Sequence, residues 1–319
     1  MSDAVIQVER LVRTFDDVQA VRGISFSVER GRVVGFVGAN GAGKTTTMRM
    51  LVTLDLPTAG RIRVCGFDAV NHPGELRHRV GWMPDGFGAY PDVTVKEYLD
   101  FMARAFGYSG ADRRARVDEV MEFTDLAKLA DREMKALSKG MSQRLCLGRA
   151  LVNDPEVMVL DEPAAGLDPK ARAEFKRLVR LLADDGKTIF ISSHILSELA
   201  EMCDSLLFID AGRIVYDGPA DGLTQPSALQ RLVRVEALEP AEALASWAEL
   251  APGVSLADVT RRGVRVKVEG EGDAAVAEVL ARLMQEGFHI IRFAPEEVRL
   301  EDAFIALLDK VKGGRHDEA

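Results

Sequence analysis

A glycine-rich stretch that ends in lysine and threonine is the part of this sequence best suited to binding phosphate. It reads Gly38, Ala39, Asn40, Gly41, Ala42, Gly43, Lys44, Thr45 and Thr46. Glycine lets the backbone turn tightly and approach an anion closely. An apolar run at 33–37 precedes the stretch and a helical segment follows it, so its N–H groups would meet an anion at a helix N-terminus. We expect Lys44 to contact the outer phosphates and the Thr45 hydroxyl to bind Mg²⁺.

Two adjacent carboxylates follow another apolar run, residues 157–160, further along the chain. In open α/β sheets, ligands bind at the carboxyl ends of the strands. Asp161 is predicted to bind Mg²⁺ directly or through water, and Glu162 to polarise the attacking water as general base. An acidic turn after a strand is common by itself. Together with the upstream glycine-rich loop, it favours nucleotide hydrolysis.

A histidine and a second glycine-containing stretch complete the candidate residues. His194 follows the apolar run 188–191, where it could donate a hydrogen bond to a γ-phosphate or orient water. Ser138, with Gly140 two residues later, is predicted to cap a helix whose exposed N-terminus forms a second anion site. Each feature alone is also compatible with an ordinary structural role.

The elements around these residues predict an α/β fold. Buried strands alternate with helices, which gives a largely parallel sheet covered on both faces, and residues 5–12 are predicted to form an edge strand. Between about 94 and 152 the period is helical, with Thr94 as a predicted N-cap and Glu97 at the capping-box position. This region is a helical insertion into the sheet domain.

A change of composition near Gly218-Pro219 marks the domain boundary. We expect a first domain at 1–222 and an accessory domain at 228–312. The order of the accessory domain is βαββαβ with a trailing helix at 300–312, which is typical of a ferredoxin-like module. Residues 313–319 are predicted to be a frayed tail. The accessory domain carries no catalytic constellation, so we expect a structural, dimerising or regulatory role.

Length, composition and charge limit the kinds of protein that this chain could be. A chain of 319 residues suits two domains, and 47% hydrophobic residues can fill sizeable cores. The formal net charge of -9 argues against coating nucleic acid, and no nucleic-acid partner is expected. Three scattered cysteines fit a reducing compartment. The sequence shows no signal peptide and no apolar stretch long enough to span a bilayer, so we expect a cytoplasmic protein that reaches a membrane only through a partner.

Taken together and in this order, the motifs resemble the ATP-binding subunit of ABC transporters over about residues 5–218. The glycine-rich stretch matches the Walker A loop, and residues 157–162 match Walker B with its catalytic glutamate. Residues 137–141 resemble the family signature and Gly166-Leu167-Asp168 the D-loop. His194 is similar to the switch histidine. Phe15 occupies the place of the aromatic residue that stacks on adenine.

Two positions depart from the family pattern. Asp85 stands where the family has the Q-loop glutamine; a carboxylate there could still serve Mg²⁺ or the attacking water. In the signature, Lys139 and Met141 replace the commoner glycine and glutamine. Ser138 and Gly140, the expected phosphate contacts, are intact.

The resemblance implies a P-loop NTPase fold of the ABC ATPase type, with a parallel-sheet core, an antiparallel β edge and a helical subdomain. It implies ATP and Mg²⁺ as cofactors, and a head-to-tail dimer with a second copy or a related chain. In that dimer, Ser138 and Gly140 of one subunit would meet the ATP on the other, and Asp168 would lie at the interface. The combination of Asp85, the signature at 137–141 and a C-terminal module that ends in residues 300–304 looks most like ATPases paired with type-two exporter permeases. The expected place is therefore the cytoplasmic face of the cell membrane.

The sequence is also compatible with other functions. The chain could be a non-transport ABC ATPase acting on ribosomes or DNA, although such relatives usually carry two cassettes or a long coiled coil. A P-loop kinase or GTPase-like switch is a further alternative, against which the adjacent Asp161 and Glu162 argue. A binding protein without turnover is another, against which Glu162 argues. The transported substrate is not readable from these residues.

Overall fold

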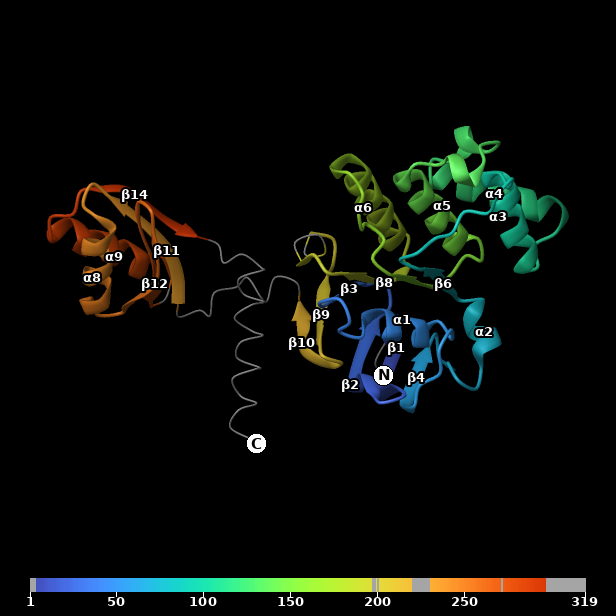
Figure 1. Ribbon diagram of the computed structural model, residues 1–319, viewed down its shortest axis with the longest axis horizontal. Coiled ribbons are helices and arrows are strands. Elements are labelled where there is room, and N and C mark those ends of the chain that lie inside the picture. Colours follow the sequence, from blue (N-terminus) through green and yellow to red (C-terminus); the bar gives the residue numbers. More distant parts are fainter. Residues whose placement is uncertain (1–3, 197–198, 200, 220–229, 271, 297–319) are drawn as a thin grey trace. The chain divides into compact units, whose positions relative to one another are not determined.

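The chain divides into two compact units, residues 1–220 (unit 1) and 221–319 (unit 2). The computed structural model describes residues 4–196, 199, 201–219, 230–270 and 272–296 (Figure 1). All the candidate site residues lie in unit 1. The predicted helix at 300–312 and the predicted tail at 313–319 lie outside the described residues.

Unit 1 is built on a six-stranded sheet with the order β10-β9-β3-β8-β7-β6. From β9 to β6 all neighbouring strands are parallel, and β10 runs antiparallel to β9. Strands β3, β7 and β8 are buried along their whole length, which explains why β7 and most of β3 and β8 consist of apolar residues. The six strands are β3 (Val33–Val37), β6 (Val80–Met83), β7 (Val157–Leu160), β8 (Thr188–Ser193), β9 (Ser205–Asp210) and β10 (Arg213–Pro219).

A second, antiparallel sheet in unit 1 has the order β2-β1-β4-β5. Its strands are β1 (Ala4–Phe15), β2 (Val18–Glu29), β4 (Ala59–Val64) and β5 (Phe67–Asp68). The prediction that residues 5–12 form an edge strand is wrong, because β1 pairs with β2 on one side and with β4 on the other. The alternation along β1 shows that one face is buried, but pairing with the distant β4 leaves no local signal.

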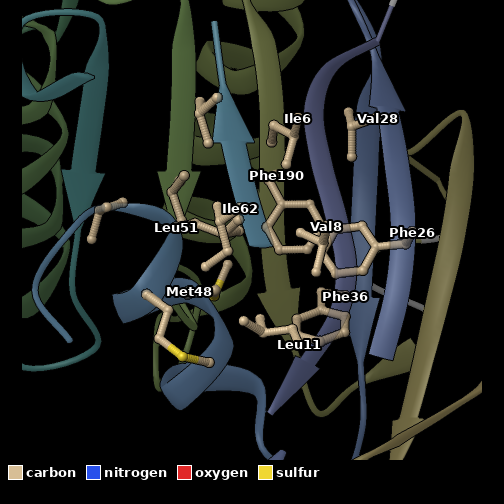
Figure 2. Packing of buried hydrophobic residues seen from close by; sticks show 14 of the residues in the cluster. Ile6, Val8, Leu11, Phe26, Val28, Phe36, Met48, Leu51, Ile62 and Phe190 are labelled. Carbon is tan, nitrogen blue, oxygen red and sulfur yellow. The ribbon is translucent and has the colours of Figure 1, made fainter. Parts of the chain in front are cut away.

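The core of unit 1 lies where the antiparallel sheet and α1 (Lys44–Leu51) cover one face of the parallel sheet (Figure 2). Phe26 of β2 stacks on Phe190 of β8, with 5.6 Å between ring centroids. Phe36 of β3 approaches Phe190 to 5.1 Å. Three aromatic rings from three strands thus lock the two sheets together, and β3 is held firmly where it leads into the glycine-rich loop.

Helices α5 and α6 cover the other face of the parallel sheet, α3 to α5 form the segment between β6 and β7, and α2 precedes β6 (Figure 1). The predicted capping box is confirmed, since the Thr94 side chain accepts from the Glu97 N–H and Glu97 bonds back to Thr94. The predicted N-cap Ser138 is confirmed as well, with Oγ accepting from the Met141 N–H. The helices are α2 (Pro73–Arg77), α3 (Val95–Ala105), α4 (Gly110–Phe123), α5 (Lys139–Leu151) and α6 (Pro169–Asp184).

Unit 2 has the predicted βαββαβ order, confirmed over its described residues. Its four-stranded sheet has the order β12-β13-β11-β14. Alternate residues of β11 and β13 pack on the two helices around a core that includes Val233, Trp247 and Val266. The elements are β11 (Gln230–Ala237), α8 (Ala241–Leu250), β12 (Val254–Thr260), β13 (Gly263–Glu269), α9 (Gly272–Gln285) and β14 (Ile290–Glu296).

Every helix among the described residues of the two units is too short or too polar to cross a lipid bilayer.

Candidate functional site

Three neighbouring strands carry the predicted site residues at the same edge of the parallel sheet. The glycine-rich loop follows β3, the pair Asp161 and Glu162 follows β7, and His194 follows β8. Because β8 lies between β3 and β7, their carboxyl ends bring these three segments together. The sheet therefore assembles residues that lie more than a hundred positions apart in the sequence.

Two glycines of the loop are required by space or by backbone conformation. A Cβ on Gly38 would lie 2.4 Å from the carbonyl oxygen of Ile209, which is fixed in β9. Gly43 has a φ of 109°, in a region that favours glycine, and a Cβ there would lie 2.7 Å from the Ala20 carbonyl oxygen. The loop thus passes tightly between β9 and β2 before α1 begins at Lys44.

Lys44 is almost fully buried, with 6% of its surface exposed, and its ammonium has three oxygen neighbours. Its Nζ donates to the carbonyl oxygen of Gly38 at 2.6 Å and to that of Ala39 at 3.3 Å. It also lies 3.3 Å from Glu162 Oε1. The loop lysine and the predicted general base therefore form an ion pair.

Glu162 joins Lys44 to His194. Its Oε2 lies 2.8 Å from His194 Nδ1 and accepts a longer bond of 3.3 Å from the His194 backbone N–H. Because a carboxylate only accepts hydrogen bonds, His194 donates from Nδ1 in this arrangement. Glu162 has a φ of 46°, an uncommon backbone conformation for a residue with a side chain. Strain of this kind is frequent at functional sites.

Asp161 is buried beside two hydroxyl groups. Burial raises the pKa of Asp161, while the hydrogen bond from Ser192 and the nearby Thr45 hydroxyl lower it and the charges of Glu162 and Asp85 raise it further. Ser192 Oγ donates to Oδ1 at 2.7 Å. Among the described residues, Oδ2 is buried and has no hydrogen-bond partner. An unpartnered carboxylate oxygen next to the Thr45 hydroxyl fits a divalent cation, which prefers oxygen ligands.

Asp85 follows β6 at the same edge of the sheet and is exposed. Its charge acts on the pKa of Asp161, so the two carboxylates face a common region. Among the described residues, no group of three or more His, Cys, Asp and Glu is placed to hold a metal. An ATPase that binds Mg²⁺ typically supplies one or two carboxylates and leaves the remaining positions to phosphate and water.

Ser138, Gly140 and Asp168 lie apart from this cluster and line a cavity of about 630 Å³. Ser138 caps α5 and Asp168 caps α6, with Asp168 Oδ1 accepting from the Ala171 N–H at 2.9 Å. A Cβ on Gly140 would lie 3.2 Å from the Ala171 side chain, so the two helix N-termini adjoin. None of the residues that line this cavity belongs to the glycine-rich loop.

Phe15 lies at the end of β1 with 40% of its surface exposed. The guanidinium carbon of Arg13 lies 4.2 Å from the centre of its ring, a cation–π contact that covers one face. Gly43 of the loop lies against Ala20 of β2, so the β1–β2 hairpin that carries Phe15 borders the glycine-rich loop.

Sequence reasoning missed two residues that support the site, Ser192 and Arg13. Ser192 contacts Asp161 and the backbone of Glu162, and Arg13 covers Phe15. Neither belongs to a motif of its own. The available signal for Ser192 was a pair of hydroxyl residues closing an apolar strand, and for Arg13 it was the two-residue spacing from Phe15, which puts both side chains on one face of β1.

A family model described as ABC transporter matches residues 21–165. The Nod factor export ATP-binding protein I of Paraburkholderia xenovorans (strain LB400) is 36% identical over 307 residues, covering 96% of this chain and 98% of the relative. The ABC transporter ATP-binding protein NatA of Bacillus subtilis (strain 168) is 38% identical, covering 66% of this chain and 88% of the relative.

Solved structures match unit 1. One is described as the dimeric structure of MJ0796, a bacterial ABC transporter cassette. It is 25% identical with a TM-score of 0.62, and the match covers 67% of this chain and 98% of that chain. The predicted fold class is confirmed by this match and by the sheet order.

Proposed function

This chain belongs to the ABC transporter family as an ATP-binding subunit with ATPase activity, and on that premise we propose that it hydrolyses Mg-ATP in a head-to-tail dimer and drives export through a separate membrane permease. The observation that carries this proposal is the cluster of Lys44, Glu162 and His194 at the carboxyl edge of the sheet. It joins a phosphate-binding cation to a candidate general base.

The nucleotide would bind between the hairpin tip and the glycine-rich loop. Phe15 would stack on the adenine, and the N–H groups from Gly38 to Thr46 would bind the phosphates. Lys44 is already placed at the start of α1, where it would exchange its bond to Glu162 for the outer phosphates. That exchange would release the Glu162 carboxylate for chemistry.

Thr45, Asp161 and Asp85 would hold Mg²⁺. The unpartnered Oδ2 of Asp161 is the oxygen best placed to accept it, with Thr45 beside it and Asp85 reaching the same region directly or through water. Mg²⁺ would neutralise the charge that develops on the phosphates. Asp85 adds a negative charge where glutamine is usual, so it would bind the cation more strongly than an amide.

Glu162 would take a proton from the attacking water, and His194 would orient that water. The contact from Nδ1 to Glu162 fixes the ring and leaves Nε2 for the nucleotide site. From there Nε2 can hold the attacking water or donate to a phosphate oxygen, the two roles expected from sequence.

Dimerisation would complete the site. The chain holds one glycine-rich loop and one cavity that contains Ser138, Gly140 and Asp168. The α5 and α6 N-termini at that cavity favour an anion, so the cavity of one subunit would cover the γ-phosphate bound to the other. The second subunit would be another copy or a related ATPase chain. The phosphate charge would then hold the dimer closed until hydrolysis.

A groove next to the Asp85 loop would receive the permease. It has a volume of about 450 Å³ and is lined by Tyr90, Asp92, Val93, Glu97, Tyr98 and Phe101. Tyr90 and Phe101 are exposed, which is unusual for two large aromatic side chains in one patch. The acidic residues in the lining fit a permease segment with apolar and basic side chains. The subunit would then lie on the cytoplasmic face of the membrane.

The Glu162→Gln variant tests the enzymatic part of this proposal. We expect ATP turnover to fall at least about 100-fold while ATP binding stays within about threefold of wild type, because only the general base is removed. Steady-state phosphate release and equilibrium ATP binding measure the two quantities. Turnover that survives this change would exclude Glu162 as the base.

The transport part is tested by recovering tagged Glu162→Gln protein from detergent-solubilised native membranes with ATP and Mg²⁺. A multi-spanning protein in stoichiometric amount is the expected result and identifies the permease. Recovery of ribosomes or DNA-associated proteins without a membrane protein would instead favour a non-transport ATPase and would overturn the permease assignment.

A further inference from the structure

We infer that Ser192 is a positioning residue that orients both Asp161 and Glu162 for the reaction. This inference rests on the proposed Mg-ATP site and adds to it a residue from the neighbouring strand. Three features of Ser192 support it: its register against β7, its burial, and the direction of its two hydrogen bonds.

The sheet register brings Ser192 next to the acidic pair. In the parallel pairing of β7 and β8, Leu160 lies opposite Ile191, so the following residues, Asp161 and Ser192, are neighbours across the strands. Phe36 of β3 pairs with Ser192 on the other side. Ser192 is completely buried. Its hydroxyl is therefore fixed between the strand that leads to the glycine-rich loop and the strand that leads to the carboxylates.

The two hydrogen bonds of Ser192 have only one possible direction. The Glu162 backbone N–H donates to Oγ at 2.9 Å, so Oγ is the acceptor there. The single hydroxyl hydrogen is then donated to Asp161 Oδ1 at 2.7 Å. One side chain thus links the carboxylate of Asp161 to the backbone of Glu162.

For Asp161, this bond determines which carboxylate oxygen is left for the cation. With Oδ1 occupied by Ser192, Oδ2 is the buried oxygen without a hydrogen-bond partner among the described residues. A group that hydrogen-bonds a metal-binding carboxylate fixes its orientation, and removal of such a group typically costs about 10–100-fold in metal affinity or activity.

For Glu162, the hydrogen bond from its backbone N–H to Ser192 Oγ holds a strained backbone in place. The φ of 46° is disfavoured for glutamate, and the anchored N–H helps to maintain it. This conformation is the one that brings the Glu162 carboxylate within reach of both Lys44 and His194. Loss of the anchor would therefore displace the general base as well as loosen the metal ligand.

The test compares nucleotide affinity with and without Mg²⁺ in the full-length protein. Binding of a non-hydrolysable ATP analogue is measured by isothermal titration calorimetry for wild type, Ser192→Ala and Ser192→Thr. We expect Mg²⁺ to tighten binding in wild type, and Ser192→Ala to reduce that gain at least about 10-fold while Mg²⁺-free affinity changes less than about twofold. Ser192→Thr keeps the hydroxyl and should retain the gain to within about threefold.

Thr188→Val is the matched control. Thr188 lies at the opposite end of β8, is completely buried, and accepts one hydrogen bond from the Gly31 N–H at 2.9 Å. Its replacement removes a buried hydroxyl from the same strand without touching the acidic pair. Mg²⁺ should therefore tighten binding of the ATP analogue by the same factor as in wild type. If Ser192→Ala does not fold, Ser192→Cys takes its place, since a thiol has similar size but donates weakly.

Each contrary result has a distinct meaning. An unchanged Mg²⁺ gain in Ser192→Ala would overturn this inference and leave the proposed Mg²⁺ site standing. An equal loss in Thr188→Val would also overturn it, because any buried hydroxyl of β8 would then suffice. A wild-type protein that binds the analogue equally well with and without Mg²⁺ would overturn the metal site itself, and this inference with it.

Discussion

At the scale of single residues, Glu162 is both the proposed general base and a residue with a strained backbone. Its φ of 46° lies in the left-handed region, where an L-residue is disfavoured by roughly 1–2 kcal/mol. The contacts that its carboxylate makes with Lys44 and His194 hold it there. The free energy of unfolding and the catalytic rate should therefore respond differently to changes at this position.

We predict that Glu162→Gly is more stable than Glu162→Ala by about 1 kcal/mol, although both abolish turnover. Each variant removes the carboxylate, so only the backbone strain relieved by glycine separates them. Urea unfolding of the two proteins at the same pH gives the difference. Equal midpoints would mean that the surrounding loop relaxes when the carboxylate is lost.

Phe15 is the residue on which adenine recognition should depend. Stacking of a base on an aromatic ring contributes about 1–3 kcal/mol, so Phe15→Ala should weaken ATP binding by about 5- to 100-fold. Val18→Ala is the control, because Val18 is exposed at the same hairpin turn and pairs with Phe15. ATP titrations of both variants provide the measurement. Comparable losses in both would point to the hairpin rather than to the ring.

At the scale of elements, an ion-pair cluster joins the starts of three strands. Glu156, just before β7, accepts from Arg30, which precedes β3, at 2.8 Å, and from Arg79, which precedes β6. The bond from Arg30 is the largest cause that holds the pKa of Glu156 below its ordinary value of 4.5. The cluster lies at the sheet edge opposite the candidate site, so it can be altered without touching the nucleotide.

The lowered pKa of Glu156 gives a pH dependence with a definite sign. A group whose pKa is lower in the folded state contributes stability above its ordinary value, and this contribution disappears as pH falls through the folded pKa. Wild type should exceed Glu156→Gln in unfolding midpoint at pH 7, and the gap should close below about pH 4.5. Urea midpoints measured from pH 7 to pH 3 test this. A gap that stays constant would assign the effect to packing.

The local sequence predicted where the strands of the parallel sheet lie in the chain better than it predicted how strands pair. The apolar runs 33–37 and 157–160 match β3 and β7, because strands buried on both faces need no alternation of polar and apolar residues. The strand β10 was not predicted, since its partly exposed residues alternate irregularly after a turn at Gly212. The internal position of β1 was missed because it depends on pairing with β4, about fifty residues away.

For the candidate site as well, the local sequence predicted the individual segments, whereas their arrangement depends on contacts between distant parts of the chain. The glycine-rich loop, the acidic pair and His194 were predicted from residue types that follow apolar runs. Their meeting at one edge needed the strand order, which places β8 between β3 and β7. Ser192 and Arg13 were missed because their roles arise from contacts across strands or along a face, and a hydroxyl or a guanidinium in a strand has many other uses.

At the scale of the whole molecule, the two units have separate hydrophobic cores. The described core of unit 1 runs from Val5 to Ile209, and that of unit 2 from Val233 to Leu283, with no residue in common. Each core is closed by its own helices and sheets. We therefore expect each unit to unfold in a separate cooperative transition.

We predict that a chain ending at residue 222 folds and binds ATP with an affinity within about threefold of the full chain. Calorimetry of the full chain should show two transitions, of which only one moves to higher temperature with ATP, because ligand stabilises only the unit that binds it. The truncated chain should show only that transition. A single transition that moves as a whole would mean that the units unfold together.

The separation of the cores also bears on how such a chain can evolve. Since the two described clusters share no side chain, fusion, loss or exchange of unit 2 need not alter the described core cluster of unit 1. The two units could therefore evolve separately: a related protein could keep unit 1 and carry a different second unit. The division between the two units near residue 220 is the place where such an exchange is expected.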